Sequence, residues 1–226
     1  MSDMRIALVG ATGLVGRTLI ARCVGLPGIR LGAIARRRME LPPGARMELF
    51  VADPENWAET LQALQPEVVI CALGTTWSKA GKDEQAFRAV DERLVLAVAH
   101  AARETGARQF IFVSSAGADF ASKHLYLRVK GEVEQALMKL RFTRLDIVRP
   151  GLLRGGRTND SRPGERLMML LSPITDLFLN GRYRAWRSIS AERLAEAMLG
   201  LACEKAGGRF IHEHDALMRV ARRFTG

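Results

Sequence analysis

The fold of this chain is decided by residues 5–16, which have the sequence RIALVGATGLVG. Residues 5–9 form a short apolar run of the kind that becomes a buried strand, and the amphipathic stretch 13–25 predicts a helix directly after it. Three glycines with Gly-x-x-Gly-x-x-Gly spacing stand where the two elements meet: Gly10, Gly13 and Gly16. The segment therefore predicts a strand, a tight glycine turn and a helix.

The same alternation of short apolar runs and amphipathic stretches continues along the chain. Further strands are predicted at 30–35, 46–51, 67–73, 108–114 and 143–148, and further helices at 54–64, 83–105, 124–140, 165–179 and 191–204. The strands are continuously apolar, which is typical of a parallel sheet covered on both faces. We therefore expect an α/β protein with a Rossmann-like, doubly wound parallel sheet.

The regular alternation fades after about residue 150. Residues 151–164, GLLRGGRTNDSRPG, are rich in glycine, arginine and turn formers and predict a long loop, and such loops are often functional. Short strands are expected near 184–189 and 208–212. We predict a single domain over residues 1–226, with a small, irregular, substrate-side region from about 151 to 226.

The composition is that of an ordinary globular protein. Of its 226 residues 48% are hydrophobic, and 34 basic against 24 acidic residues give a net charge of +10. The apolar content excludes intrinsic disorder. Three cysteines at unrelated spacings form no disulfide framework, and no secretory signal opens the chain, so we expect a cytosolic location. No apolar stretch is long enough for a transmembrane helix, and no membrane partner is expected.

The positive charge raises the question of a nucleic-acid partner. The basic residues are scattered among apolar ones, with no basic face interleaved with aromatic residues, so no nucleic-acid binding is expected. His212 and His214 share one side of a predicted strand, but no third ligand is evident, so no metal is expected. The chain is compatible with a monomer or a homodimer.

The glycine turn predicts a dinucleotide site. The first glycine permits the turn, the second lets the backbone approach a pyrophosphate, and the third lets the helix pack on the strand. Backbone N–H groups and the helix dipole favour phosphates at this point. The candidate cofactor-binding residues here are Gly10, Thr12, Gly13, Leu14, Val15 and Gly16.

The end of the second predicted strand bears on the choice of coenzyme. An NAD site usually has an acidic residue here for the ribose hydroxyl, whereas this chain has Arg36 and Arg37, followed by Arg38. Guanidinium groups bind a 2′-phosphate by charge-assisted hydrogen bonds, so NADP(H) is expected and NAD(H) less so, with Arg36 the preferred contact. After the third strand, Asp53 is a candidate to contact adenine or to cap the next helix.

A candidate catalytic group lies farther along. The strand at 108–114 ends in a serine pair that includes Ser115, and the next helix carries Tyr126 and Lys130 on one face because they are four residues apart. An ammonium close to a phenol stabilises its phenolate and suits it to proton transfer. Ser115 is then positioned to hydrogen-bond a substrate carbonyl or alcohol.

At this point the sequence resembles the short-chain dehydrogenase/reductase superfamily, and within it the atypical NAD(P)H-binding branch related to the Tat-interacting oxidoreductase. The resemblance covers nearly the whole chain and rests on GATGLVG (10–16), CALGTTWSKAG (71–81), FVSSAGAD (112–119), LYLRVKGEVE (125–134), RPGLL (149–153) and SRPGE (161–165). It implies bound NADP(H), a Ser115, Tyr126 and Lys130 site, and Asp53 near adenine.

The resemblance also implies cofactor contacts from Leu73 and Gly74 after the fourth strand, and from Pro150 and Gly151 near the nicotinamide. One departure concerns Asp91, which stands where many superfamily members have an asparagine that supports a proton relay to the lysine. The expected function is an NADP-dependent oxidoreductase with a small carbonyl or alcohol substrate. The alternatives are a redox-sensing NADP(H)-binding regulator with little turnover, and an epimerase or dehydratase that retains NADP.

The substrate region is rich in arginine. Five arginines crowd the loop after residue 148: Arg149, Arg154, Arg157, Arg162 and Arg166. Guanidinium groups bind carboxylates and phosphates, so the loop predicts a small-molecule substrate with an anionic group.

Overall fold

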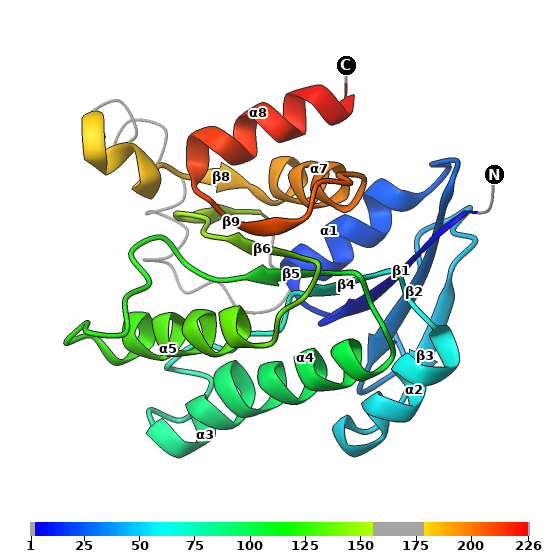
Figure 1. Cartoon of the computed structure of the whole chain (residues 1–226), viewed down its shortest axis with the longest axis horizontal. Coiled ribbons are helices and arrows are strands. Elements are labelled where there is room, and N and C mark those ends of the chain that lie inside the picture. The colour runs from blue at the N-terminus through cyan, green and yellow to red at the C-terminus, as the bar shows by residue number, and fades with distance from the viewer. Residues whose placement is uncertain (1–2, 156–178, 226) are drawn as a thin grey trace.

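A parallel sheet forms the centre of the molecule (Figure 1). The computed structural model of the chain describes residues 3–155 and 179–225. Within them seven strands pair in the order β3-β2-β1-β4-β5-β6-β9, all parallel. The strands are β1 (Met4–Val9), β2 (Ile29–Ala35), β3 (Glu48–Val51), β4 (Val68–Cys71), β5 (Gln109–Val113), β6 (Arg144–Val148) and β9 (Gly208–His212). The predicted doubly wound α/β fold is confirmed.

The order of the strands places a crevice at the end of β1. The chain proceeds outward from β1 to β3 and then crosses back to β4, so that β1 lies between β2 and β4. At its carboxyl end Val9 is in register with Ile34 on one side and Cys71 on the other. In open α/β sheets ligands bind at such a reversal, outside the carboxyl ends of the strands.

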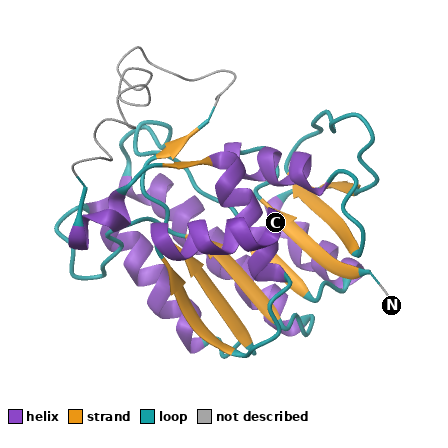
Figure 2. Cartoon of the chain, turned by 90° about the horizontal axis from the view of Figure 1, so that it is seen from above, coloured by secondary structure: helices purple, strands orange, loops and turns teal. Residues whose placement is uncertain are grey.

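Helices cover both faces of the sheet. In Figure 1 α1 (Leu14–Cys23), α7 (Ala191–Ala202) and α8 (His214–Thr225) lie above it. The helices α2 (Trp57–Leu64), α3 (Glu84–Arg88), α4 (Val95–Glu104) and α5 (Leu125–Lys139) lie below it. The view from above in Figure 2 shows α7 and α8 crossing over the strands.

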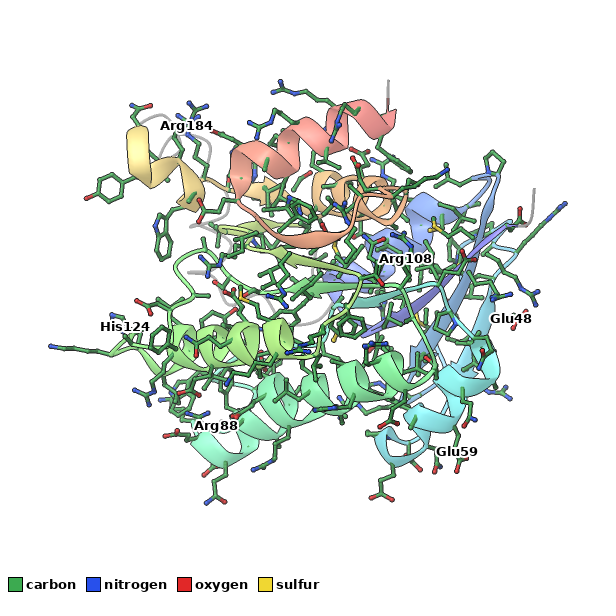
Figure 3. The ribbon with its side chains drawn as sticks, in the orientation of Figure 1. Glu48, Glu59, Arg88, Arg108, His124 and Arg184 are labelled. Atoms are coloured by element: carbon green, nitrogen blue, oxygen red, sulfur yellow. The ribbon has the colours of Figure 1, made fainter. Side chains whose placement is uncertain are left out.

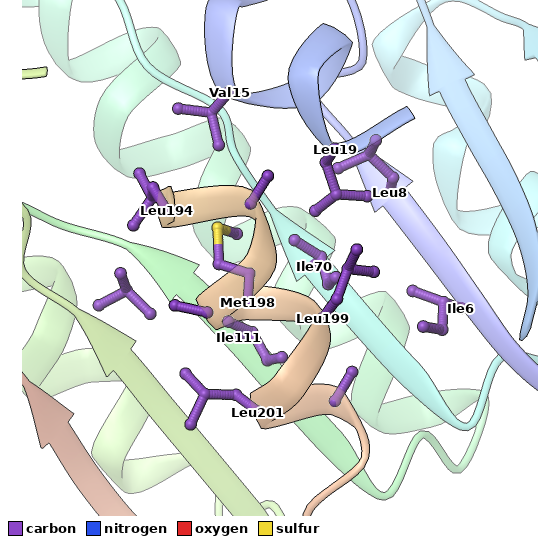
Figure 4. Packing of buried hydrophobic residues seen from close by; sticks show 14 of the residues in the cluster. Ile6, Leu8, Val15, Leu19, Ile70, Ile111, Leu194, Met198, Leu199 and Leu201 are labelled. Carbon is purple, nitrogen blue, oxygen red and sulfur yellow. The ribbon is translucent and has the colours of Figure 1, made fainter. Parts of the chain in front are cut away.

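Two apolar layers fill the space between the helices and the sheet. On one face Leu8 and Ile70 of the strands pack with Leu19 of α1 and Met198 of α7 (Figure 4). On the other face Val69 and its strand neighbours pack with α2, α4 and α5. Successive strand residues point to opposite faces, and both faces are buried, which explains why the strands are continuously apolar.

The long helix predicted at 83–105 is present as α3, a π-helical turn η2 (Ala89–Leu94) and α4 in succession. The prediction of a strand near 184–189 is wrong for most of that segment. Residues Gly181–Trp186 form a 3-10 helix, η3, and the sheet edge next to β6 is taken by β9. Only Ile189–Ser190 is extended, as β8, and it pairs with β7 (Leu153–Arg154) in a second small sheet.

Sequence reasoning missed α8 and β7. The apolar residues of α8, among them Leu217, Val220 and Ala221, follow helical spacing and are buried against α7. The predicted helix 165–179, except for its last residue, and most of the loop 151–164 lie outside the described residues.

Two further features concern helix length and metal-ligating side chains. Within 3–155 and 179–225 no helix has both the length and the apolar character needed to cross a bilayer. Within the same ranges no group of three or more His, Cys, Asp or Glu side chains is placed to hold a metal ion.

Candidate active site

Two of the three loop glycines are required by the protein itself. Gly10 has a φ of +95°, which side chains rarely adopt, and a Cβ atom there would lie 2.6 Å from the carbonyl group of Ala72. A Cβ atom at Gly16 would lie 2.3 Å from the carbonyl oxygen of Gly10. These glycines let the loop turn beside β4 and let α1 pack against it.

Gly13 is different, because no contact within the described residues requires a glycine there. Its φ is −75°, and the nearest atom to an added Cβ would be the oxygen of Gly10 at 3.5 Å. Gly13 is also the N-cap of α1, and no side chain caps the helix there. The N–H groups of the first turn are therefore available to an anion. An exposed glycine beside these donors fits the phosphates of a dinucleotide.

The remaining residues of the glycine loop have distinct surroundings. The side chain of Val15 is buried in the core, so only its backbone is suited to contact a cofactor. Leu14 packs against Gly155, which follows β7. Thr12 is held by Arg17, whose Nε donates to the carbonyl oxygen of Thr12 at 3.0 Å. Sequence reasoning missed Arg17, since its role depends on a contact across the first turn of the helix.

The residues proposed for the adenosine end of a cofactor lie at the ends of β2 and β3. Arg36 and Arg37 are exposed, and within the described residues their side chains have no acidic partner. Asp53 occupies the N-cap position of the short helix η1 (Pro54–Asn56), but its side chain makes no capping hydrogen bond. All three side chains are therefore exposed and suited to contact a ligand. Of the two roles expected for Asp53, the helix cap lacks its hydrogen bond, and the exposed carboxylate is compatible with a contact to adenine.

Tyr126 and Lys130 lie on the first two turns of α5, and Lys130 is at the centre of the candidate site. Lys130 is buried, with its Nζ 3.0 Å from Asp91 Oδ1 and 5.0 Å from the centre of the Phe112 ring. Burial disfavours its charged form, but the charges of Asp91 and Tyr126 outweigh burial and raise its pKa. Tyr126 is 38% exposed, so its phenol remains accessible.

Asp91 is positioned by an unusual turn of helix. It lies in the π-helical turn η2, and such turns are frequent at functional sites. Its second oxygen, Oδ2, accepts a hydrogen bond of 2.7 Å from the backbone N–H of Thr75. A Cβ atom at Gly74 would lie 3.4 Å from Asp91 Oδ1 and 3.8 Å from Lys130 Nζ. The loop after β4 therefore lies directly against the Asp91–Lys130 pair. Leu73, the residue before Gly74, is half-buried.

Ser114 and Ser115 face different surroundings. Ser114 is buried and bonds Glu134 on α5, and Glu134 also accepts a hydrogen bond of 3.0 Å from Arg149 Nε at the end of β6. Ser115 is half-buried and makes one long hydrogen bond, of 3.2 Å, to the carbonyl oxygen of Ala116. Among the described residues the Ser115 hydroxyl is engaged only by this long bond, so of the two serines Ser115 is the one suited to contact a ligand.

The Ser114–Glu134–Arg149 group was missed by sequence reasoning. A signal was present, because Tyr126, Lys130 and Glu134 recur every four residues on one face of α5. Arg149, one of the arginines expected at the substrate loop, is engaged by Glu134 in an ion pair that is buried on the Glu134 side. Arg154 is described near the end of β7, whereas Arg157, Arg162 and Arg166 lie outside the described residues.

Pro150 and Gly151 connect β6 to the substrate-side region. The carbonyl oxygen of Pro150 accepts a 2.8 Å hydrogen bond from Ala116 N, which ties this loop to the one after Ser115. A Cβ atom at Gly151 would lie 2.3 Å from the carbonyl oxygen of Arg187, so the glycine is required by packing. The ring of Trp186 similarly covers Gly117.

These loops meet at the carboxyl end of the sheet. His124, the N-cap of α5, and Arg184, on η3, lie at the same end of the molecule in Figure 3, away from Glu48. Tyr126 there contacts the ring of Phe87 at 5.8 Å between centroids. Contacts therefore link the glycine loop to the loop after β4, that loop to α5, and the loop after β5 to the loop after β6, all at the carboxyl end of the sheet.

Comparison with protein families shows to which family the chain belongs. Residues 10–201 match the family model described as NAD(P)H-binding. The chain belongs to this NAD(P)H-binding family. The match begins at Gly10 and includes every other candidate cofactor and catalytic residue discussed above.

Curated relatives cover most of the chain. The protein fmp52, mitochondrial, of Aspergillus fumigatus is 34% identical over 210 residues, which is 90% of this chain and 88% of the relative. The protein HTATIP2 of Rattus norvegicus is 39% identical over 171 residues, 74% of this chain and 69% of the relative. The expected resemblance to the atypical short-chain dehydrogenase/reductase branch is confirmed.

Solved structures share the fold. MoeE5 in complex with UDP-glucuronic acid and NAD superposes with a TM-score of 0.70 at 14% identity, covering 92% of this chain and 75% of that one. The UDP-glucose 4-epimerase of Thermus thermophilus in complex with NAD gives 0.69 at 17% identity, covering 98% and 84%. At this identity the likeness concerns the fold alone.

The comparisons overturn the expected location. Several relatives, including those of Emericella nidulans and Candida albicans, are named mitochondrial, which contradicts the prediction of a cytosolic protein. The prediction depended on three unpaired cysteines, which separate oxidising from reducing compartments but do not distinguish one reducing compartment from another.

Proposed function

We propose that this protein is an NADP-dependent oxidoreductase that transfers hydride between the nicotinamide and a small carbonyl or alcohol substrate. The observation that carries the proposal is the accessible Tyr126 one helical turn from a buried Lys130, which Asp91 holds as an ammonium ion. A buried cation beside an accessible phenol is what proton transfer to a carbonyl oxygen requires.

The residues that would hold the cofactor line the crevice from one end to the other. The glycine loop would bind the pyrophosphate, Arg36 and Arg37 the 2′-phosphate, and Asp53 the adenine. Leu73, Gly74, Pro150, Gly151 and Lys130 would surround the nicotinamide ribose and ring. When bound, the nicotinamide supplies or accepts the hydride.

The proton and the substrate are handled by three side chains of the chain itself. Tyr126 Oη would donate a proton to the developing alkoxide in reduction and accept it in oxidation. Lys130 stabilises the phenolate, since opposite charges favour each other's ionised form. Ser115 Oγ would hydrogen-bond the substrate oxygen and orient it toward Tyr126.

The tyrosines of the chain provide the test and its control. Tyr126→Phe is expected to lower kcat at least about 100-fold, because it removes the proton donor, and to leave NADPH affinity within a factor of about 3. Tyr183→Phe, which changes the other tyrosine of the chain, on η3, is expected to keep full activity. The measurement is NADPH oxidation with a panel of small aldehydes and ketones.

The same assay separates this proposal from the alternatives. Equal rates for Tyr126→Phe and the wild type would remove Tyr126 from the mechanism. A wild-type protein that binds NADPH but reduces none of the compounds would contradict the proposal, and the redox-sensing regulator or the epimerase with retained NADP would then be favoured.

A further inference from the structure

A second cavity lies on the α7–α8 side of the small β7–β8 sheet. It has a volume of about 260 Å³. Its polar lining comes from several separate segments, namely β7, the stretch 187–190, α7 and α8: Arg154, Arg187, Arg193, Ser188, Ser190 and His214. Neither a carboxylate nor a residue of the glycine loop is among the described residues that line it.

The charge of this cavity is positive even after its neighbours are considered. Arg193 pairs with Glu196 at 2.9 Å, and His214 contacts Asp215 at 3.2 Å. Arg187 donates to two neutral oxygens, Leu179 O at 2.8 Å and Asn180 Oδ1 at 3.2 Å, and its charge also acts on Asp215. Because Glu196 is shared with Arg22 and Asp215 with Arg184, the basic groups around the cavity still outnumber the acidic ones. A concave surface lined by guanidinium groups attracts anions.

Arg154 gives independent evidence for a ligand. Its Nε is buried and has no hydrogen-bond partner among the described residues. Buried polar groups are almost always hydrogen-bonded in native proteins, and each exception needs an explanation. An anion in the adjoining cavity would provide the missing acceptor.

We propose that this cavity binds a phosphoryl group. Three guanidinium groups and the Ser190 hydroxyl match the several acceptor oxygens of a phosphate. The volume is below the roughly 300 Å³ at which typical ligand pockets begin, so the cavity suits one end of a molecule. The anion is thus bound by Arg154, Arg187 and Arg193, at a site separate from the glycine loop.

The cavity is connected to the candidate active site through the backbone. Arg187 lines the cavity, and its own carbonyl oxygen packs on Gly151. The preceding residue, Trp186, covers Gly117, two residues after Ser115. The phosphoryl group is therefore assigned to the substrate, as the end distant from the reacting carbonyl. This assignment rests on the proposed oxidoreductase function, whereas phosphate binding does not.

The experiment measures binding of inorganic phosphate to the full-length protein by isothermal titration calorimetry, with NADPH present at saturation to fill the nucleotide site. Arg154→Gln and Arg193→Gln are each expected to weaken phosphate binding at least tenfold. Arg222→Gln, an exposed change on α8 with the same loss of charge, is expected to leave it unchanged. Acetate, a carboxylate probe, is expected to bind at least tenfold more weakly than phosphate.

Absent phosphate binding, equal binding by all variants, or equal binding of acetate would overturn the proposal. Activity is tested separately with glyceraldehyde 3-phosphate and glyceraldehyde. Arg154→Gln is expected to reduce the preference for the phosphorylated aldehyde at least tenfold, and an unchanged preference would overturn the assignment to the substrate. If neither aldehyde is reduced while phosphate binding remains sensitive to Arg154, the substrate assignment fails and the anion site stands. The oxidoreductase proposal fails as well only if none of the panel of aldehydes and ketones is reduced.

Discussion

The Nζ atom of Lys130 lies 3.0 Å from Oδ1 of Asp91, and both side chains are buried. The two residues are 39 positions apart in sequence and come from α5 and the π-helical turn η2. A buried ion pair is costly to break from one side only, because the remaining charge loses its partner. The pair therefore fixes α5 to the π-helical turn η2 and keeps Lys130 charged.

Asp91→Asn is expected to lower the free energy of unfolding by about 3 kcal/mol, because it leaves a buried ammonium without a counter-ion. In the wild type the pKa of Lys130 is raised in the folded state above its ordinary value of 10.5. The contribution of the pair to the free energy of unfolding is therefore fully present below about pH 10.5, and it is lost as the pH rises through the raised pKa. Urea unfolding at pH 8 and at pH 11 measures both effects. Glu84→Gln, in an exposed pair with Arg88, serves as control, and a loss as large as that of Asp91→Asn would contradict the argument.

Gly13→Ala is expected to lower stability by no more than about 1 kcal/mol, the order of the cost of alanine at an N-cap, because the new Cβ makes only an ordinary van der Waals contact, 3.5 Å from the Gly10 oxygen, at an ordinary φ. It is expected to weaken NADPH binding at least tenfold, since the methyl group would occupy the approach to the helix N-terminus. Gly16→Ala is the matched comparison and is expected to destabilise the fold, because its Cβ would clash with the Gly10 carbonyl. Thermal unfolding and fluorescence titration with NADPH measure the two properties, and undiminished NADPH binding by Gly13→Ala would remove the glycine loop from the cofactor site.

Arg36→Ala is expected to weaken NADPH binding about tenfold or more while leaving NADH binding unchanged, because hydrogen bonds to charged groups contribute about 1.5–3 kcal/mol each. Arg37→Ala is expected to act in the same direction with a smaller effect. Arg209→Ala, an exposed change on β9, controls for the loss of net charge. A parallel decrease for both coenzymes would argue against a 2′-phosphate contact.

Glu134→Gln is expected to destabilise the protein by about 3 kcal/mol, because Arg149 loses its partner and Ser114 its charged acceptor. Adding Arg149→Met to this variant is expected to recover part of the loss. A double-mutant cycle in urea unfolding measures the coupling, and additive single effects would show that the pair does not link α5 to β6.

Acid stability is expected to depend on Asp146. Burial alone would raise its pKa, but hydrogen bonds from His212, Arg144 and Gln109 outweigh burial and lower the pKa below its ordinary value of 3.8. Its contribution to stability is therefore complete above about pH 3.8 and is lost as the pH falls through the folded-state pKa. Asp146→Asn is expected to flatten this part of the pH–stability curve, measured by urea unfolding between pH 2.5 and pH 5. A curve of unchanged slope would assign the acid sensitivity to other carboxylates.

Much of the fold was predictable because it depends on contiguous residues. The strands β1, β2, β4, β5 and β6 were evident as apolar runs, and the helix carrying Asp91 as one continuous amphipathic stretch. The segment Gly181–Trp186 was not, because alternating side chains form a strand only where a neighbouring strand has an open edge, and β9 takes the edge beside β6. The helix α8 was missed at the end of the chain although its apolar spacing was present.

By itself the sequence determined the glycine turn, the one-face spacing of Tyr126 and Lys130, and the alternation that makes a doubly wound sheet. These are properties of neighbouring residues, set by the helical and extended periods of the backbone. Only the tertiary structure decided that Asp91 pairs with Lys130, that Arg149 is engaged by Glu134, and that Arg154, Arg187 and Arg193 surround one cavity. Such contacts join segments far apart in the chain, and their partners are chosen by the packing of helices on the sheet.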